Sequence, residues 1–105
     1  MADIMKLLQQ AQQMQGRLQQ IQDELQQRTV SASAGGGMVT VNADGKGQIR
    51  SIKIDPSVVN PSDVEMLEDL ILVALTDVQR RATALAQEEM GKLTGGLGLP
   101  FQLPL

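Results

Sequence analysis

The feature that most constrains this chain is an apolar stripe in its first 28 residues. Apolar side chains recur at alternating spacings of three and four, which is the a/d pattern of a coiled coil: Ile4, Leu7, Ala11, Met14, Leu18, Ile21 and Leu25. The pattern predicts one long helix over residues 3–28. Because so narrow a stripe needs a partner helix, the partner must come from elsewhere in the chain or from a second copy.

A β segment follows this helix. Three stretches alternate between apolar and polar side chains and predict strands: residues 29–34, 38–42 and 48–54. Ile49 breaks the alternation, so we expect a bulge or a change of pairing near Arg50. Asp44-Gly45 is a hairpin turn signal. The sequence therefore predicts a three-stranded antiparallel meander with one apolar face, spanning residues 29–54.

A second long helix is predicted over residues 62–90. Ser62 with Glu65 fits a capping box, in which the serine caps the first turn and the glutamate reaches back to it. The apolar stripe of this helix is wide, so we expect it to pack against both the sheet and another helix. The predicted organisation is one domain over residues 1–90 and a flexible tail over 91–105, which is rich in Gly, Leu and Pro.

The residue types present argue against an enzyme. The chain has neither Cys nor His, which removes the usual zinc ligands and the commonest general base, so no metal and no cofactor are expected. Gly45-Lys46 and Gly91-Lys92 both fail the phosphate-loop pattern, because neither has the required upstream glycine or the following Ser or Thr. The glycine-rich stretches are therefore interpreted as turns.

No membrane or export segment is expected. The longest apolar run, Leu70 to Leu75, is far shorter than the ~20 residues of a membrane-spanning helix. The N-terminus is rich in Gln and lacks the apolar region of a signal peptide. A cytoplasmic protein is the expectation.

Charge is unevenly distributed along the chain. The formal net charge is −3, yet residues 45–54 carry three bases and no acid, and residues 61–79 carry five acids and no base. A polarised surface and a mixed, solvated one both fit this distribution. Basic residues outside the first helix's stripe, in the second helix or near its end are candidates for phosphate contacts: Lys6, Arg17, Arg80, Arg81 and Lys92. With one aromatic residue, Phe101, stacking on single strands is not expected, so duplex DNA is favoured.

Four segments in order resemble the YbaB/EbfC family of bacterial nucleoid-associated proteins. They are "MADIMKLLQQAQQMQ" at the start, "GGGMVTVNADGKGQIRSIKIDPSVV" in residues 35–59, "DVEMLEDLILVALTDVQRRA" in residues 63–82 and "EEMGKLTGGLGLP" in residues 89–100. The resemblance covers nearly the whole chain.

The resemblance implies an α+β fold with an α-β-β-β-α protomer, in which the meander packs on long helices. It further implies a tight homodimer with protruding helical arms that bind duplex DNA with low or modest sequence preference. A role in organising the nucleoid or modulating gene expression would follow, without catalysis. The alternative is a non-enzymatic adaptor that engages another protein through its Gln-rich arm and C-terminal tail.

Overall fold

The structure, a computed structural model, describes residues 2–96, with side chains from Asp3 to Leu93. In chain order the elements are α1 (Ala2–Gln27), β1 (Thr29–Ala34), β2 (Val39–Asp44), β3 (Ile49–Ile54), the 3₁₀ turn η1 (Pro56–Val58) and α2 (Val64–Gly96). The predicted α-β-β-β-α order is confirmed. Residues 97–105 of the predicted tail lie outside the described residues.

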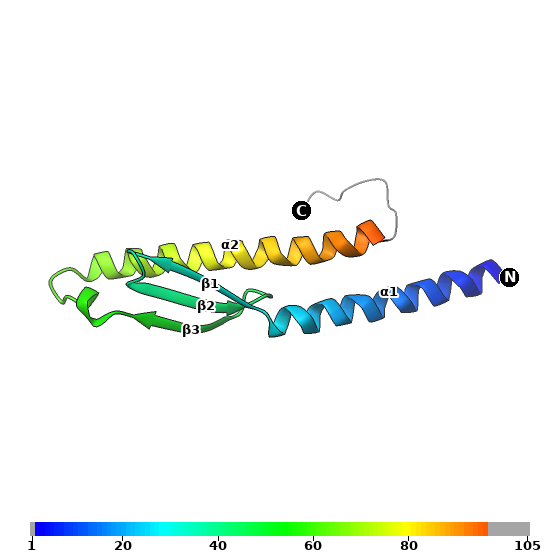
Figure 1. The fold of residues 1–105 in the computed structure, drawn as a ribbon, viewed down its shortest axis with the longest axis horizontal. Coiled ribbons are helices and arrows are strands. Elements are labelled where there is room, and N and C mark those ends of the chain that lie inside the picture. Colours follow the sequence, from blue (N-terminus) through cyan, green and yellow to red (C-terminus); the bar gives the residue numbers. More distant parts are fainter. Residues whose placement is uncertain (1, 97–105) are drawn as a thin grey trace.

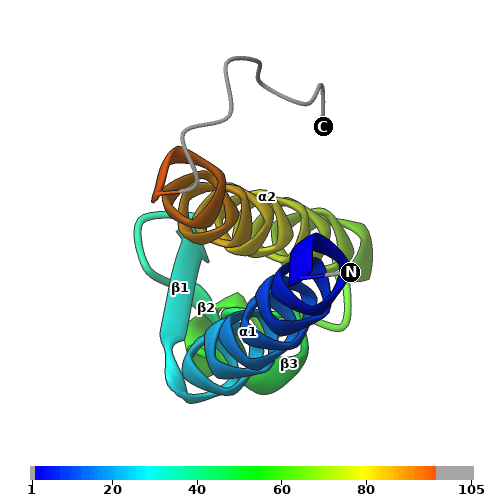
Figure 2. The same cartoon turned by 90° about the vertical axis from the view of Figure 1, so that its right-hand side faces the viewer.

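The molecule is elongated, with principal extents of 73 × 24 × 16 Å. The first half of α2 covers one face of the sheet, and its second half continues past the sheet beside α1 (Figure 1). Viewed along the long axis of the molecule, α1 and α2 both project beyond the same end of the sheet (Figure 2). We call residues 2–28, 44–50 and 80–96 the arm end. The opposite part, residues 53–77, is the distal end.

The sheet has the order β1-β2-β3 and both pairs of strands are antiparallel. Its register changes next to Asn42, which faces Ser51, whereas Ala43 faces Ile49. Arg50 is therefore the extra residue of a β-bulge. This bulge confirms the pairing change that was predicted from the broken alternation at Ile49.

The core between the sheet and α2 is built from small side chains. Its buried members are Ala32, Ala34, Val39, Val41, Ala43, Ala74 and Val78. Small residues on both surfaces let the helix backbone lie close to the strands. The helix packs on β1 and β2, so β3 is left partly uncovered: Ile52, which pairs with Val41 across the sheet, remains exposed, as does Ile54.

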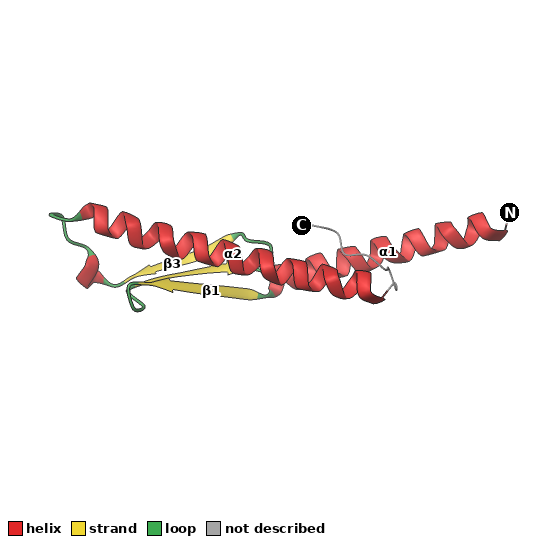
Figure 3. Ribbon diagram, turned by 90° about the horizontal axis from the view of Figure 1, so that it is seen from above, coloured by secondary structure: helices red, strands yellow, loops and turns green. Residues whose placement is uncertain are grey.

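The other face of the sheet is polar. Asn42 donates from Nδ2 to the Ser51 hydroxyl at 3.0 Å and accepts a hydrogen bond from the Ser31 hydroxyl on the other side. Ser33 and Thr40 form a second cross-strand pair at 3.2 Å. These neutral side chains satisfy one another's hydrogen-bonding groups. The helix α2 lies on the opposite face of the sheet (Figure 3).

Two details of α2 differ from the prediction. The side chain of Asp63, not Ser62, caps the helix by accepting the Met66 N–H at 3.2 Å, while the Ser62 N–H donates to Asn60. The helix also continues to Gly96, past the predicted end at residue 90. Leu93 is buried in this last stretch, so packing outweighs the ~1 kcal/mol cost of the helical Gly91.

Candidate nucleic-acid interface

The turn between β2 and β3 fixes the base of the arm. The Gly45 N–H donates to the Leu25 carbonyl at 2.7 Å, an acceptor at the end of α1 that also receives the Arg28 N–H at 3.1 Å. A Cβ atom at position 45 would lie 2.6 Å from the same oxygen. Glycine is therefore required here by the close approach of the helix.

A buried carboxylate holds this turn in shape. Asp44 is only 2% exposed. It accepts the backbone N–H groups of Lys46 and Gln48 at 2.9 and 3.0 Å, and Nη2 of Arg50 at 2.9 Å. Burial raises the pKa of Asp44, but the hydrogen bonds from Gln48, Lys46 and Arg50 together outweigh it and hold the pKa below its usual value. Asp44 therefore remains charged and organises the turn on which α1 rests.

Glu89 of α2 provides a second anchor at the base of the arm. Its carboxylate lies 3.7 Å from Nη1 of Arg28 and 3.3 Å from Nζ of Lys92. The Glu89 side chain is largely buried, whereas both cations are more than half exposed. One acid thus joins the end of α1 to α2 and partly neutralises two bases.

The two predicted site residues of α1 share one side of that helix. Lys6 and Arg17 are exposed, and neither forms an ion pair with any residue of the described chain. They are eleven residues apart, close to three helical turns, so they lie about 16–17 Å apart along the axis. The pair forms a row of two free positive charges on the arm.

The three predicted residues of α2 do not join them in a single cluster. Arg80 is exposed and has no ion pair among residues 2–96, while Nε of Arg81 binds Asp77 at 3.2 Å. Adjacent helical positions differ by about 100°, so these two arginines face different sides. Lys92 follows about 18 Å further along the axis and is held by Glu89. The five residues are therefore spread over both helices of the arm end.

Three further bases lie at the same end and are outside the predicted set: Lys46, Arg28 and Arg50, the last of which is paired with Asp44. Lys46 is exposed in the β2–β3 turn, and the described residues give it no acidic partner. Arg28 follows the last residue of α1. A signal for Arg28 exists in the sequence, because Lys6, Arg17 and Arg28 recur every eleven residues and so return to nearly the same side of a helix.

Folding separates the charges of the chain along its long axis. Eight of the nine bases are at the arm end with six acids, a net charge of +2. The distal end carries one base, Lys53, and six acids, a net charge of −5, which together give the −3 of the whole chain. The acidic character of the protein is thus a property of its distal end.

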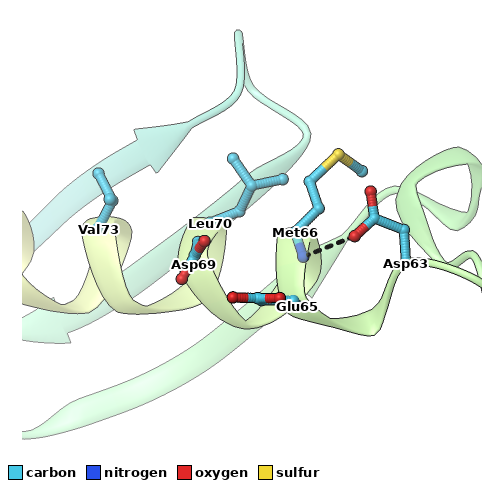
Figure 4. A pocket seen from close by; sticks show the side chains of 6 residues that line it. All are labelled: Asp63, Glu65, Met66, Asp69, Leu70 and Val73. Carbon is cyan, nitrogen blue, oxygen red and sulfur yellow. Dashed lines mark hydrogen bonds between the residues drawn. The ribbon is translucent and has the colours of Figure 1, made fainter.

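A shallow hollow near the start of α2 shows the acidic character of the distal end (Figure 4). Its lining combines three carboxylates with apolar side chains: Asp63, Glu65, Asp69, Met66, Leu70 and Val73. Among the residues that the structure describes, none of those lining the hollow is basic. Carboxylates repel phosphates, so this hollow is not the nucleic-acid interface.

Membrane-spanning helices and metal-ligand clusters are both absent from the described residues. Neither α1 nor α2 has an apolar stretch that would cross a lipid bilayer, within the described part of the chain. Residues 2–96 also contain no group of three or more acidic, His or Cys side chains placed to hold a metal ion.

Comparisons with known proteins agree with the fold. The model of the YbaB/EbfC DNA-binding family matches residues 1–97. A nucleoid-associated protein of Gemmatimonas aurantiaca is 56% identical over 102 residues, covering 97% of this chain and 98% of the relative. One of Desulfotalea psychrophila is 49% identical, covering 93% and 92%. The crystal structure of an uncharacterized protein of Helicobacter pylori, 23% identical, covers 87% of this chain and 91% of its own with a TM-score of 0.70.

Proposed function

Because this chain belongs to the YbaB/EbfC DNA-binding family, we propose that it binds duplex DNA through backbone phosphates with low or modest sequence preference. The observation that carries the proposal is the concentration of eight of the nine bases at the arm end. It gives an acidic protein a local surface that attracts phosphates. Phosphate contacts hold a protein on the duplex without reading its sequence, which accounts for the low preference.

We assign direct contacts first to Lys6, Arg17 and Arg80, which have no acidic partner in the described chain. Arg81 and Lys92 contribute less, because the phosphate must compete with a carboxylate already at 3.2 or 3.3 Å. The cation of each pair is more than half exposed, so solvent screens the ion pair, and the competition weakens these two contacts without preventing them.

We further propose that the protein acts as a homodimer. Large apolar side chains are exposed on the outer side of α2 and on β3: Met66, Leu72, Val73, Ile52 and Ile54. A second copy placed over them would bury this surface, as small domains often need for stability. Two-fold symmetry would also double the number of basic arms.

The role that fits this assembly is organisation of the nucleoid, with effects on gene expression, in the cytoplasm. The relatives carry the name nucleoid-associated protein. A dimer that grips phosphates with two arms can bind many sites on a chromosome without catalysing a reaction. Catalysis has no support in a chain that lacks both His and Cys.

A duplex-binding titration at increasing salt tests the proposal. The logarithm of the affinity should fall linearly with the logarithm of salt, with a slope of about −0.9 for each phosphate neutralised. Replacing Lys6, Arg17 and Arg80 together by Ala should weaken binding and flatten this slope. Lys53→Ala is the matched control, because it removes a base from the distal end.

Two outcomes would overturn the assignment. Loss of affinity in Lys53→Ala but not in the triple variant would place the interface at the distal end. No binding at low salt and micromolar protein would exclude duplex DNA and favour the adaptor function. Light scattering that gives the mass of a single chain at the same concentration would contradict the dimer.

A further inference from the structure

The first half of α1 carries an apolar face that no described residue covers. Ile4, Leu7 and Leu8 are 61%, 64% and 60% exposed, and Ala11 continues the same face one turn later. Spacings of three, four and seven residues place these side chains on one side of a helix. We call Ile4, Leu7, Leu8 and Ala11 the tip stripe.

The tip stripe begins where the cover provided by α2 stops. Along the heptad pattern, Leu25 is buried, the next three positions toward the N-terminus are half-buried, and Ala11 is exposed. The helices run in opposite directions, so α2 heads toward the N-terminus of α1 and ends beside it (Figures 1 and 3). The chain that follows Gly96 therefore starts next to the uncovered half of α1.

The sequence after α2 matches such a surface in composition. Residues 97–105 read "LGLPFQLPL", with five large apolar side chains at alternate positions, no charge, and the only aromatic residue of the protein. The family model matches residues 1–97, so residues 98–105 lie beyond the matched region. The protein thus has an apolar helix face that no described residue covers and an apolar segment that begins beside that face.

We propose that residues 97–105 dock in an extended conformation along the tip stripe of their own chain. Nine residues can span about 30 Å, whereas the helix from Met14 to Ile4 rises only about 15 Å. Pro100 and Pro104 restrict the backbone and lower the entropy lost on docking. Direct attachment also gives the segment an effective concentration in the millimolar range, which a second copy at micromolar concentration does not match.

Docking at this place leaves the proposed DNA contacts free. Lys6 is two residues from both Ile4 and Leu8, which is about 160° around the helix from each of them. The segment would thus cover one side of α1 while the basic side stays open. The inference is independent of DNA binding and can be tested without it.

A spin label provides the test, because the chain contains no Cys and a single label site can be introduced. In the full chain, Gln102→Cys carrying a nitroxide should broaden the NMR signals of the Ile4, Leu7 and Leu8 methyl groups. Leu7→Asp places a charge on the tip stripe and should abolish the broadening. Gln9→Asp adds the same charge to the other side of the helix and should preserve it.

A mixed sample separates the possible occupants. Spin-labelled protein without isotope is refolded together with isotope-labelled protein without spin label. Broadening in this sample equal to that in the single-species sample would show docking on a second copy and overturn the proposal. Absence of broadening in both samples, or equal loss in Leu7→Asp and Gln9→Asp, would also overturn it.

Discussion

Replacing Asp44 by Asn tests whether one buried carboxylate holds the base of the arm. Asp44 is 2% exposed and accepts three hydrogen bonds of 2.9–3.0 Å. Hydrogen bonds to a charged group contribute about 1.5–3 kcal/mol each. Asn keeps one oxygen for the backbone donors but loses the charge and the pair with Arg50, whose side chain is 52% exposed and can return to water. We therefore expect a loss of about 2 kcal/mol.

Thermal unfolding at fixed protein concentration measures this loss. A change of 2 kcal/mol corresponds to a decrease in midpoint of about 8–16 °C for a domain of this size. Asp55→Asn is the control: this acid also accepts a backbone N–H, from Ser57, but it is exposed, so its midpoint should change much less. Arg50→Met removes only the exposed partner of Asp44, so its decrease in midpoint should be intermediate between those of Asp44→Asn and Asp55→Asn.

The pH dependence of the stability difference between wild type and Asp44→Asn can refute the role assigned to Asp44. The folded-state pKa of Asp44 lies below its usual value, so its contribution to stability is present above the unfolded pKa of about 3.9 and is lost as the pH falls through the lower folded value. The difference between wild type and Asp44→Asn should therefore be constant near neutral pH and shrink in acid. An unchanged midpoint at pH 7, or a difference that persists undiminished in strong acid, would refute the assigned role.

Further predictions concern the arm. Gly45→Ala should lower the unfolding midpoint, because its Cβ would meet the Leu25 carbonyl at 2.6 Å, while Gly16→Ala, which meets no atom within 4 Å, should raise it by increasing helix stability by about 1 kcal/mol. Leu18→Asp should reduce helix content measured by circular dichroism, since it places a charge on the half-buried part of the apolar stripe of α1. Glu89→Gln should release its two cations and strengthen duplex binding in the titration, with a steeper salt slope; weaker binding would contradict the proposed competition.

Much of the fold could be predicted because local patterns determine it. The bulge at Arg50 follows from a single break in alternation, and the two helices follow from apolar periodicity. The cap of α2 was predicted wrongly because Ser62 and Asp63 are adjacent and both residue types cap helices, so a one-residue choice depended on the loop before them. The end of α2 was placed too early because the burial of Leu93 is a tertiary effect.

The candidate site could be predicted only as a list of bases, because which of these bases lie close together in space depends on the topology of the fold. Lys46 and Arg80 are 34 positions apart in sequence, yet the return of β2 and the direction of α2 bring both to the arm end. The acids of residues 55–77 are carried to the other end by the same turn of the chain, which separates charges that composition averages to −3. An acidic isoelectric point therefore says little about phosphate binding in an elongated fold. The relevant quantity is the local charge within a screening length of about 8–10 Å, far shorter than the 73 Å of the molecule.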